Sequence, residues 1–110
     1  MIGLRTFFAG LLLVSAAAAP SSAAAPGMAV NWVEVSGDQD DCVKQATNSL
    51  KRNNFGTRFE VINNRTLYGE RGDYTAAVRC VADKSIAFVA VAGPKSDVTE
   101  KYAQAIKDGF

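Results

Sequence analysis

Two cysteines, Cys42 and Cys80, constrain the fold of this 110-residue chain most strongly, because they are the only cysteines in it. Cys42 lies in a segment whose apolar residues have helical spacing, and Cys80 lies in a segment that alternates as a β-strand does. Four roles are open to the pair: a reactive nucleophile, a metal ligand, buried thiols, or a disulfide that joins the two segments. The compartment in which the chain folds decides among them.

The first 24 residues have the pattern of a secretory signal peptide. Arg5 supplies a short positive region, an apolar stretch follows at residues 7–14, and small residues that suit signal peptidase end the segment. The apolar stretch is shorter than the roughly 20 apolar residues that cross a bilayer, which disfavours a stable membrane anchor. We expect cleavage after Ala24, with Ala18 as the alternative position, and export to the periplasm or the exterior.

An exported compartment favours the disulfide among the four roles of the cysteines. The chain contains no histidine, which removes the cysteine–histidine pairs of nucleophilic catalysis and the mixed cysteine–histidine zinc sites. A disulfide closes a loop of roughly 39 residues and stabilises a domain by about 4 kcal/mol. We predict a structural disulfide between Cys42 and Cys80, with a buried free thiol as the alternative.

Residues 25–110 are long enough for one small domain, and their patterns predict six elements in the order β-α-β-β-β-α. The predicted strands are residues 29–35, 57–63, 74–81 and 86–92, and the predicted helices are residues 39–54 and a segment from Ser96 to the C-terminus. Both helices begin with acidic residues and carry one apolar stripe. We expect an α+β fold, a two-layer sandwich with two helices on one face of a mainly antiparallel four-stranded sheet.

The segment RTLYGERGDY, at residues 65–74, contains two glycines that interrupt the alternation. It is interpreted as the start of a strand, a bulge or a hairpin tip. If it is a hairpin tip, three of its side chains are a possible binding loop: Arg71, Asp73 and Tyr74.

The sheet face opposite the helices is predicted to combine an apolar centre with charged neighbours. Cys80 defines the face that packs on the helices, and residues of opposite phase lie on the open face. The predicted open face, a possible binding face, includes Ile62, Ala77, Arg79, Val89 and Val91. Such a face is a candidate binding or dimer surface. The alternative is that a loop or the N-terminal segment covers it.

Composition argues against several classes of function. The chain contains 12 Lys and Arg residues against 11 Asp and Glu residues, and loss of Arg5 with the signal peptide leaves them balanced. A nucleic-acid-binding domain normally has a basic excess, so nucleic acid is not an expected partner. No catalytic motif and no set of zinc ligands is recognisable, so we expect no enzymatic activity, catalytic residue, metal or cofactor.

A family resemblance rests on two neighbouring segments. Residues 72–80 have the pattern GxYxAxxRC, and residues 89–94 read VAVAGP before a closing amphipathic helix. Together with the signal peptide and the early helical cysteine, this combination resembles small exported bacterial proteins of unassigned function. The resemblance covers most of residues 25–110 and implies export, and it transfers no activity and no site residues.

These patterns predict an exported, non-enzymatic module that binds a protein of the bacterial envelope. The alternative expectation is a homodimeric structural or stress-related envelope protein that associates sheet against sheet. Both expectations use the open face of the sheet.

Overall fold

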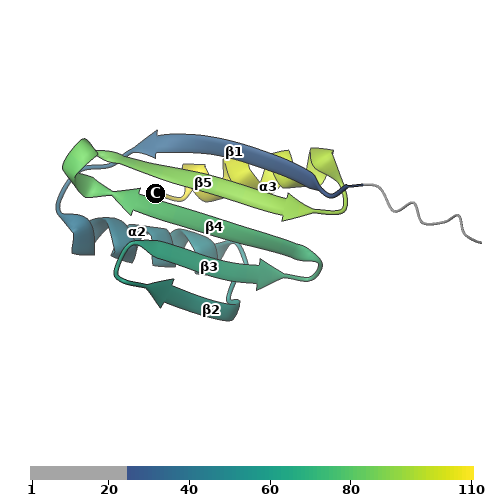
Figure 1. The fold of residues 1–110 in the computed structure, drawn as a ribbon, viewed down its shortest axis with the longest axis horizontal. Helices are drawn as coiled ribbons and strands as arrows, with labels where there is room; N and C mark the ends of the chain where they lie inside the picture. The colour runs from purple at the N-terminus through teal and green to yellow at the C-terminus, as the bar shows by residue number, and fades with distance from the viewer. Residues whose placement is uncertain (1–24) are drawn as a thin grey trace, which may run out of the picture.

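The computed structural model describes residues 25–110, which form one antiparallel sheet with two helices on one of its faces (Figure 1). The elements are β1 (Gly27–Glu34), α2 (Gln39–Arg52), β2 (Thr57–Ile62), β3 (Thr66–Arg71), β4 (Tyr74–Val81), the 3₁₀ turn η3 (Ala82–Lys84), β5 (Ile86–Gly93) and α3 (Ser96–Asp108). The predicted signal peptide, residues 1–24, lies outside the described residues. Within residues 25–110, neither helix is long and apolar enough to cross a membrane.

The predicted α+β class is confirmed, but the sheet has five strands rather than four. The additional strand is β3, which comes from the segment whose glycines were expected to interrupt regular structure. β3 pairs with β4 without a break, from Thr66 opposite Arg79 to Arg71 opposite Tyr74. A glycine reduces strand propensity, but a ladder that continues on both sides outweighs that local cost.

The strands lie in the order β1-β5-β4-β3-β2, and every neighbouring pair is antiparallel. Strands β2 to β5 form a meander, whereas β1 is added beside β5 at the opposite edge from β2. Helix α2 therefore carries the chain from one edge of the sheet to the other. Helix α2 packs on β3 and β4, and α3 packs on β1 and β5 (Figure 1).

Helix α2 begins with a reciprocal pair of hydrogen bonds between two aspartates. The backbone N–H of Asp41 donates to the Asp38 carboxylate at 2.9 Å, and the backbone N–H of Asp38 donates to the Asp41 carboxylate at 3.0 Å. These bonds satisfy backbone donors that a helix start leaves without intrahelical partners, and the negative charges oppose the positive end of the helix dipole.

The substitution Asp38→Ala is expected to lower the free energy of unfolding by about 1 kcal/mol, because it removes a side-chain acceptor at the helix start. Urea denaturation followed by circular dichroism measures the loss. Asp38→Ser is the matched control, since a hydroxyl still accepts a hydrogen bond and should retain most of the stability. Equal losses in the two variants would show that the cap contributes nothing specific.

The core lies between the helices and the inner face of the sheet, and a disulfide lies within it, near the start of α2 and the end of β4. Cys42 on α2 and Cys80 on β4 are joined, with an S–S distance of 2.11 Å and a Cα–Cα distance of 6.0 Å. The predicted disulfide is confirmed. The other buried apolar residues of the core are Val35, Ala46, Leu50, Phe55, Leu67, Ala76, Val78, Ala87, Val89, Val91, Ala103 and Ile106.

The Gln39 side chain reinforces the same junction between α2 and the sheet. Its Nε2 donates to the backbone carbonyls of Asn64 at 2.8 Å and Cys80 at 3.0 Å, and its Oε1 accepts from the backbone N–H of Ala82 at 3.1 Å. One amide therefore joins the start of α2 to the β2–β3 turn and to the end of β4.

The orientation of β5 corrects part of the predicted open face. Val89 and Val91 are fully buried beneath the helices. Val89 lies opposite Val78, and Ala87 lies opposite Cys80. Opposite residues of an antiparallel pair share a face, so Val89 and Val91 lie on the inner face with Cys80. The segment IAFVAVA is apolar at every position. Its sequence therefore does not show which of its residues point toward the helices and which point outward.

Candidate functional site

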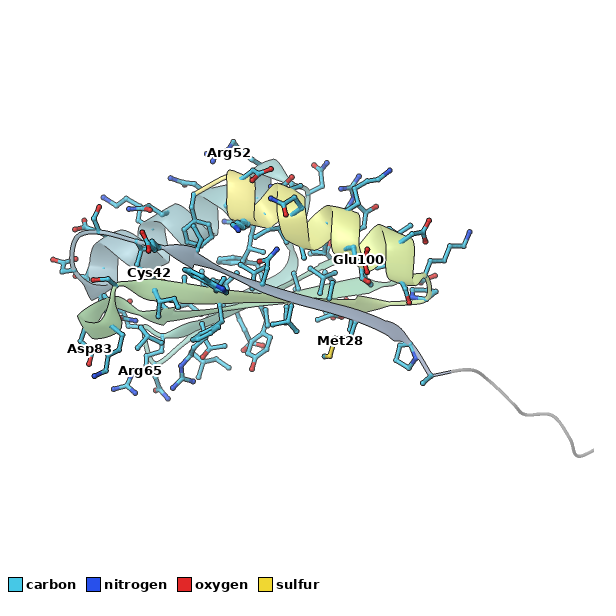
Figure 2. All side chains as sticks on the ribbon, turned by 90° about the horizontal axis from the view of Figure 1, so that it is seen from above. Met28, Cys42, Arg52, Arg65, Asp83 and Glu100 are labelled. Atoms are coloured by element: carbon cyan, nitrogen blue, oxygen red, sulfur yellow. A yellow bond between two sulfur atoms is a disulfide. The ribbon has the colours of Figure 1, made fainter. Side chains whose placement is uncertain are left out.

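The sheet face turned away from the helices, here called the outer face, carries a cluster of exposed apolar side chains. Its members come from four of the five strands: Met28, Val30, Trp32, Ile62, Tyr68 and Phe88. Figure 2 shows Met28 below the sheet, on the side opposite both helices. Among the described residues, only Val61 is a large exposed hydrophobic residue outside this cluster; it lies opposite the buried Leu67, on the inner face.

The strand register arranges the outer face in rows. One row consists of Trp32, Phe88, Arg79, Thr66 and Ile62, each opposite the next on the neighbouring strand. The adjacent row consists of Val30, Ala90, Ala77, Tyr68 and Glu60. The first row therefore places two aromatic side chains beside each other and next to a cation. In the second row, the two alanines between Val30 and Tyr68 have short side chains, so they project less from the sheet than their neighbours do.

Two arginines stand at one end of the outer face. Arg65 and Arg79 line the same surface hollow of about 500 Å³, together with Ile62, Asn63, Thr66 and Tyr68. Figure 2 shows Arg65 on the same side of the sheet as Met28. Arg79 donates to the Thr66 hydroxyl at 3.1 Å, which engages only part of its guanidinium.

The acidic residue Glu70, also on the outer face, is neutralised by Arg58 at 2.9 Å. That contact is the only ion pair within residues 25–110, so neither Arg65 nor Arg79 has a carboxylate partner there. The two arginines are the cations at this end of the outer face, and Asp38 and Asp83 line a neighbouring hollow of about 670 Å³ with them. The chemical groups that such an end recognises are carboxylates and phosphates.

The structure brings together three of the five residues predicted for the open face. Ile62, Ala77 and Arg79 lie on the outer face, whereas Val89 and Val91 are buried under the helices. The residues predicted for the open face did not include Trp32 or Phe88. The sequence does not show the register between β4 and β5. This register places Phe88 opposite Arg79, and therefore on the same face of the sheet as Arg79.

The predicted binding loop is a short turn between two paired strands, and two of its three side chains already have partners. Arg71 donates to the backbone carbonyl of Asn53 at 3.2 Å, and its guanidinium lies 4.4 Å from the centre of the Tyr102 ring. Tyr74 meets the same ring edge-on, with centroids 5.2 Å apart. These contacts hold α3 against the sheet. Asp73 alone is exposed.

Residues 25–110 contain no group of three or more Asp, Glu and Cys side chains placed to hold a metal ion. No family model, no curated protein and no solved structure matches the chain.

Proposed function

We propose that this chain is an exported, non-enzymatic binding module that holds a partner protein against its outer face. One observation carries the proposal: Trp32 and Phe88 are 51% and 44% exposed while they stand opposite each other on neighbouring strands. Adjacent exposed aromatic side chains mark interaction surfaces, and aromatic residues dominate the binding energy of protein interfaces.

The charge of the outer face defines the chemistry of the partner. Phe88 lies one strand away from Arg79 and Trp32 lies two strands away, which correspond to about 5 and 10 Å. The matching surface is a protein segment with an apolar side chain and a carboxylate at that separation. The apolar group covers the aromatic pair, and the carboxylate meets Arg79 and Arg65 through charge-assisted hydrogen bonds.

The disulfide supports the exported location. Disulfides persist in oxidising compartments, and Cys42 and Cys80 are bonded to each other in the core. The expected partner is therefore a protein of the bacterial envelope or exterior. The alternative, a homodimer that associates sheet against sheet, uses the same outer face and would compete with this partner.

Site-specific photocrosslinking in intact cells tests the proposal. Benzoylphenylalanine in place of Phe88 is expected to crosslink one heterologous protein, because that ring points from the outer face into the partner. Benzoylphenylalanine in place of Val61 is the control, since Val61 is similarly exposed but lies on the inner face at the edge of the sheet. The two positions should give different products.

The charge reversal Arg79→Glu is expected to reduce the crosslinked product at least tenfold, because it sets a carboxylate against the partner's carboxylate. Lys44→Glu, at an exposed position on α2, makes the same change of charge away from the outer face and should leave the yield unchanged. Equal crosslinking from positions 61 and 88, or no response to Arg79→Glu, would refute binding through the outer face. Self-crosslinks alone would favour the homodimer.

A further inference from the structure

Two surface hollows adjoin at one end of the sheet. The hollow of about 500 Å³ on the outer face and the neighbouring hollow of about 670 Å³ share Arg65 and Arg79. The larger hollow extends past Val81 to the turn η3 and to the start of α2, where Asp83 and Asp38 line it. Figure 2 shows Asp83 and Arg65 at this end of the sheet, both on the side turned away from the helices. The surface that a partner can contact therefore continues from the outer face to two carboxylates.

The charges in the larger hollow are not paired with one another. The contact between Arg58 and Glu70 is the only ion pair within residues 25–110, so no arginine of the hollow is paired with either aspartate. Lys84 follows Asp83 in the chain but does not line the hollow. Two cations and two anions leave the hollow without a net formal charge. A single charged group therefore meets attraction and repulsion there together, whereas a ligand that carries both charges in the matching order is attracted by both.

Of the two carboxylates, that of Asp83 is the more available to a partner. Asp38 caps α2: its Oδ1 accepts a hydrogen bond from the backbone N–H of Asp41 at 2.9 Å, and the positive end of the helix dipole lies beside it. Asp83 lies in the turn η3 and is exposed, and no ion pair engages it. A cation that enters the larger hollow therefore interacts more favourably with Asp83 than with Asp38.

We propose that the partner segment carries a basic side chain beyond its carboxylate, so that an apolar, an acidic and a basic side chain follow one another in that order. The apolar side chain covers Trp32 and Phe88. The acidic side chain meets Arg79, and the basic side chain meets Asp83 across the larger hollow. This inference rests on the proposed function and names the sequence pattern of the partner, with Asp83 as the residue that determines specificity.

The path of the chain sets the spacing of the two charges in the partner. From Arg79, two residue steps run along β4 and two more lie in the 3₁₀ turn η3 before Asp83 is reached. At about 3.4 Å per strand residue and about 2 Å per 3₁₀ residue, the Cα atoms of Arg79 and Asp83 are at most about 11 Å apart. An extended partner segment covers about 10 Å in three residues. The basic residue is therefore expected about two to four positions from the acidic one, because lysine and arginine side chains are long and flexible.

Asp83 selects by repulsion as well as by attraction. An ion pair at an exposed site contributes little to affinity by itself. A partner segment with a second carboxylate in place of the basic side chain brings like charges together at Asp83, which disfavours that partner. The measurable consequence is a preference between partners, and we expect at least about fivefold tighter binding of a segment with lysine at this position than of one with glutamate.

Selection from a random peptide library displayed on phage tests the pattern. The exported, oxidised chain is the target, and only peptides that bind the native chain better than Phe88→Ala are kept, because these contact the outer face. The enriched peptides are expected to carry an acidic and a basic residue in one fixed order. Selection against Asp83→Lys should replace the basic residue with an acidic one. Asp73→Lys is the control, since Asp73 is exposed in the β3–β4 turn at the other end of the sheet, and it should leave the pattern unchanged.

Fluorescence anisotropy of one selected peptide measures the size of the preference. Replacement of its basic residue by glutamate is expected to weaken binding to the native chain at least about fivefold, and Asp83→Lys should restore it. Equal affinity of the two peptides for the native chain would overturn the inference, as would an unchanged pattern with Asp83→Lys or a library without any peptide that depends on Phe88. None of these results alters the photocrosslinking at position 88, so this inference and the proposed function fail separately.

Discussion

Replacement of both cysteines, Cys42→Ala together with Cys80→Ala, is expected to lower the free energy of unfolding by about 4 kcal/mol or more. The disulfide spans a sequence separation of 38, and a loop of this length gives about 4 kcal/mol on the chain-entropy estimate. Both side chains are buried, so their truncation adds the cost of lost packing. Small domains have a total stability of about 5–15 kcal/mol, so the variant loses a large share of it.

Urea denaturation of the oxidised native chain, the reduced native chain and the double-alanine variant separates the contribution of the crosslink to stability from that of side-chain packing. The reduced native chain lacks the bond but keeps both sulfur atoms, whereas the double-alanine variant lacks the bond and the sulfurs. We expect most of the loss in the reduced chain and a smaller further loss in the variant. A reduced chain whose midpoint matches that of the oxidised chain would show that the crosslink does not stabilise the fold.

The substitution Gly69→Ala is expected to cost at least about 3 kcal/mol, because it forces a methyl group into a closely packed backbone. Gly69 lies on the inner face of β3, where an added Cβ would be 2.0 Å from the carbonyl oxygen of Phe55. That oxygen belongs to the main chain, so no side-chain rotation relieves the contact. Phe55 itself is fully buried, and its N–H donates to the carbonyl of Leu50 at 2.9 Å, which fixes its position.

Gly56→Ala is the matched control for this prediction. A Cβ at Gly56 meets no atom within 4 Å, and this glycine does not have a positive φ. Its substitution should change the stability by less than about 1 kcal/mol, and the sign is expected to be favourable because alanine restricts the unfolded chain. Thermal unfolding of the two variants measures the difference. Similar melting temperatures for Gly56→Ala and Gly69→Ala would contradict the steric argument.

Much of the inner layer could be predicted from local pattern. The helix expected at residues 39–54 is observed at Gln39–Arg52, and the strand expected at residues 74–81 is observed with those bounds. Ala76, Val78 and Cys80 lie at every second position of β4 and share its inner face, so this face could be identified from the sequence. The disulfide was predicted from the expected export and the absence of histidine, and the phase of Cys80 agrees with it, because the apolar stripe of a helix packs on the inner face of the sheet.

The outer face could be predicted only in part, because its composition depends on pairing between strands. β5 is apolar on both faces, so Phe88 and Val89 look equivalent in the sequence although one is exposed and the other buried. β3 was missed because Gly69 signals a break locally, whereas the close approach of Phe55 is what requires a glycine there. Both features are tertiary: they depend on a neighbouring strand or on a loop distant in sequence.

The position of β1 at the far edge of the sheet separates this strand from its partner by most of the sequence of the domain. β1 is the first strand in the sequence, yet its partner in the sheet is β5, about 50 residues later, a length that takes roughly 3 to 10 s to synthesise. The meander of β2 to β5 has short connections, so its strand contacts are local in sequence, unlike those of β1 with β5. The first strand of the domain to be made therefore waits for its partner until β5 and the residues before it are available.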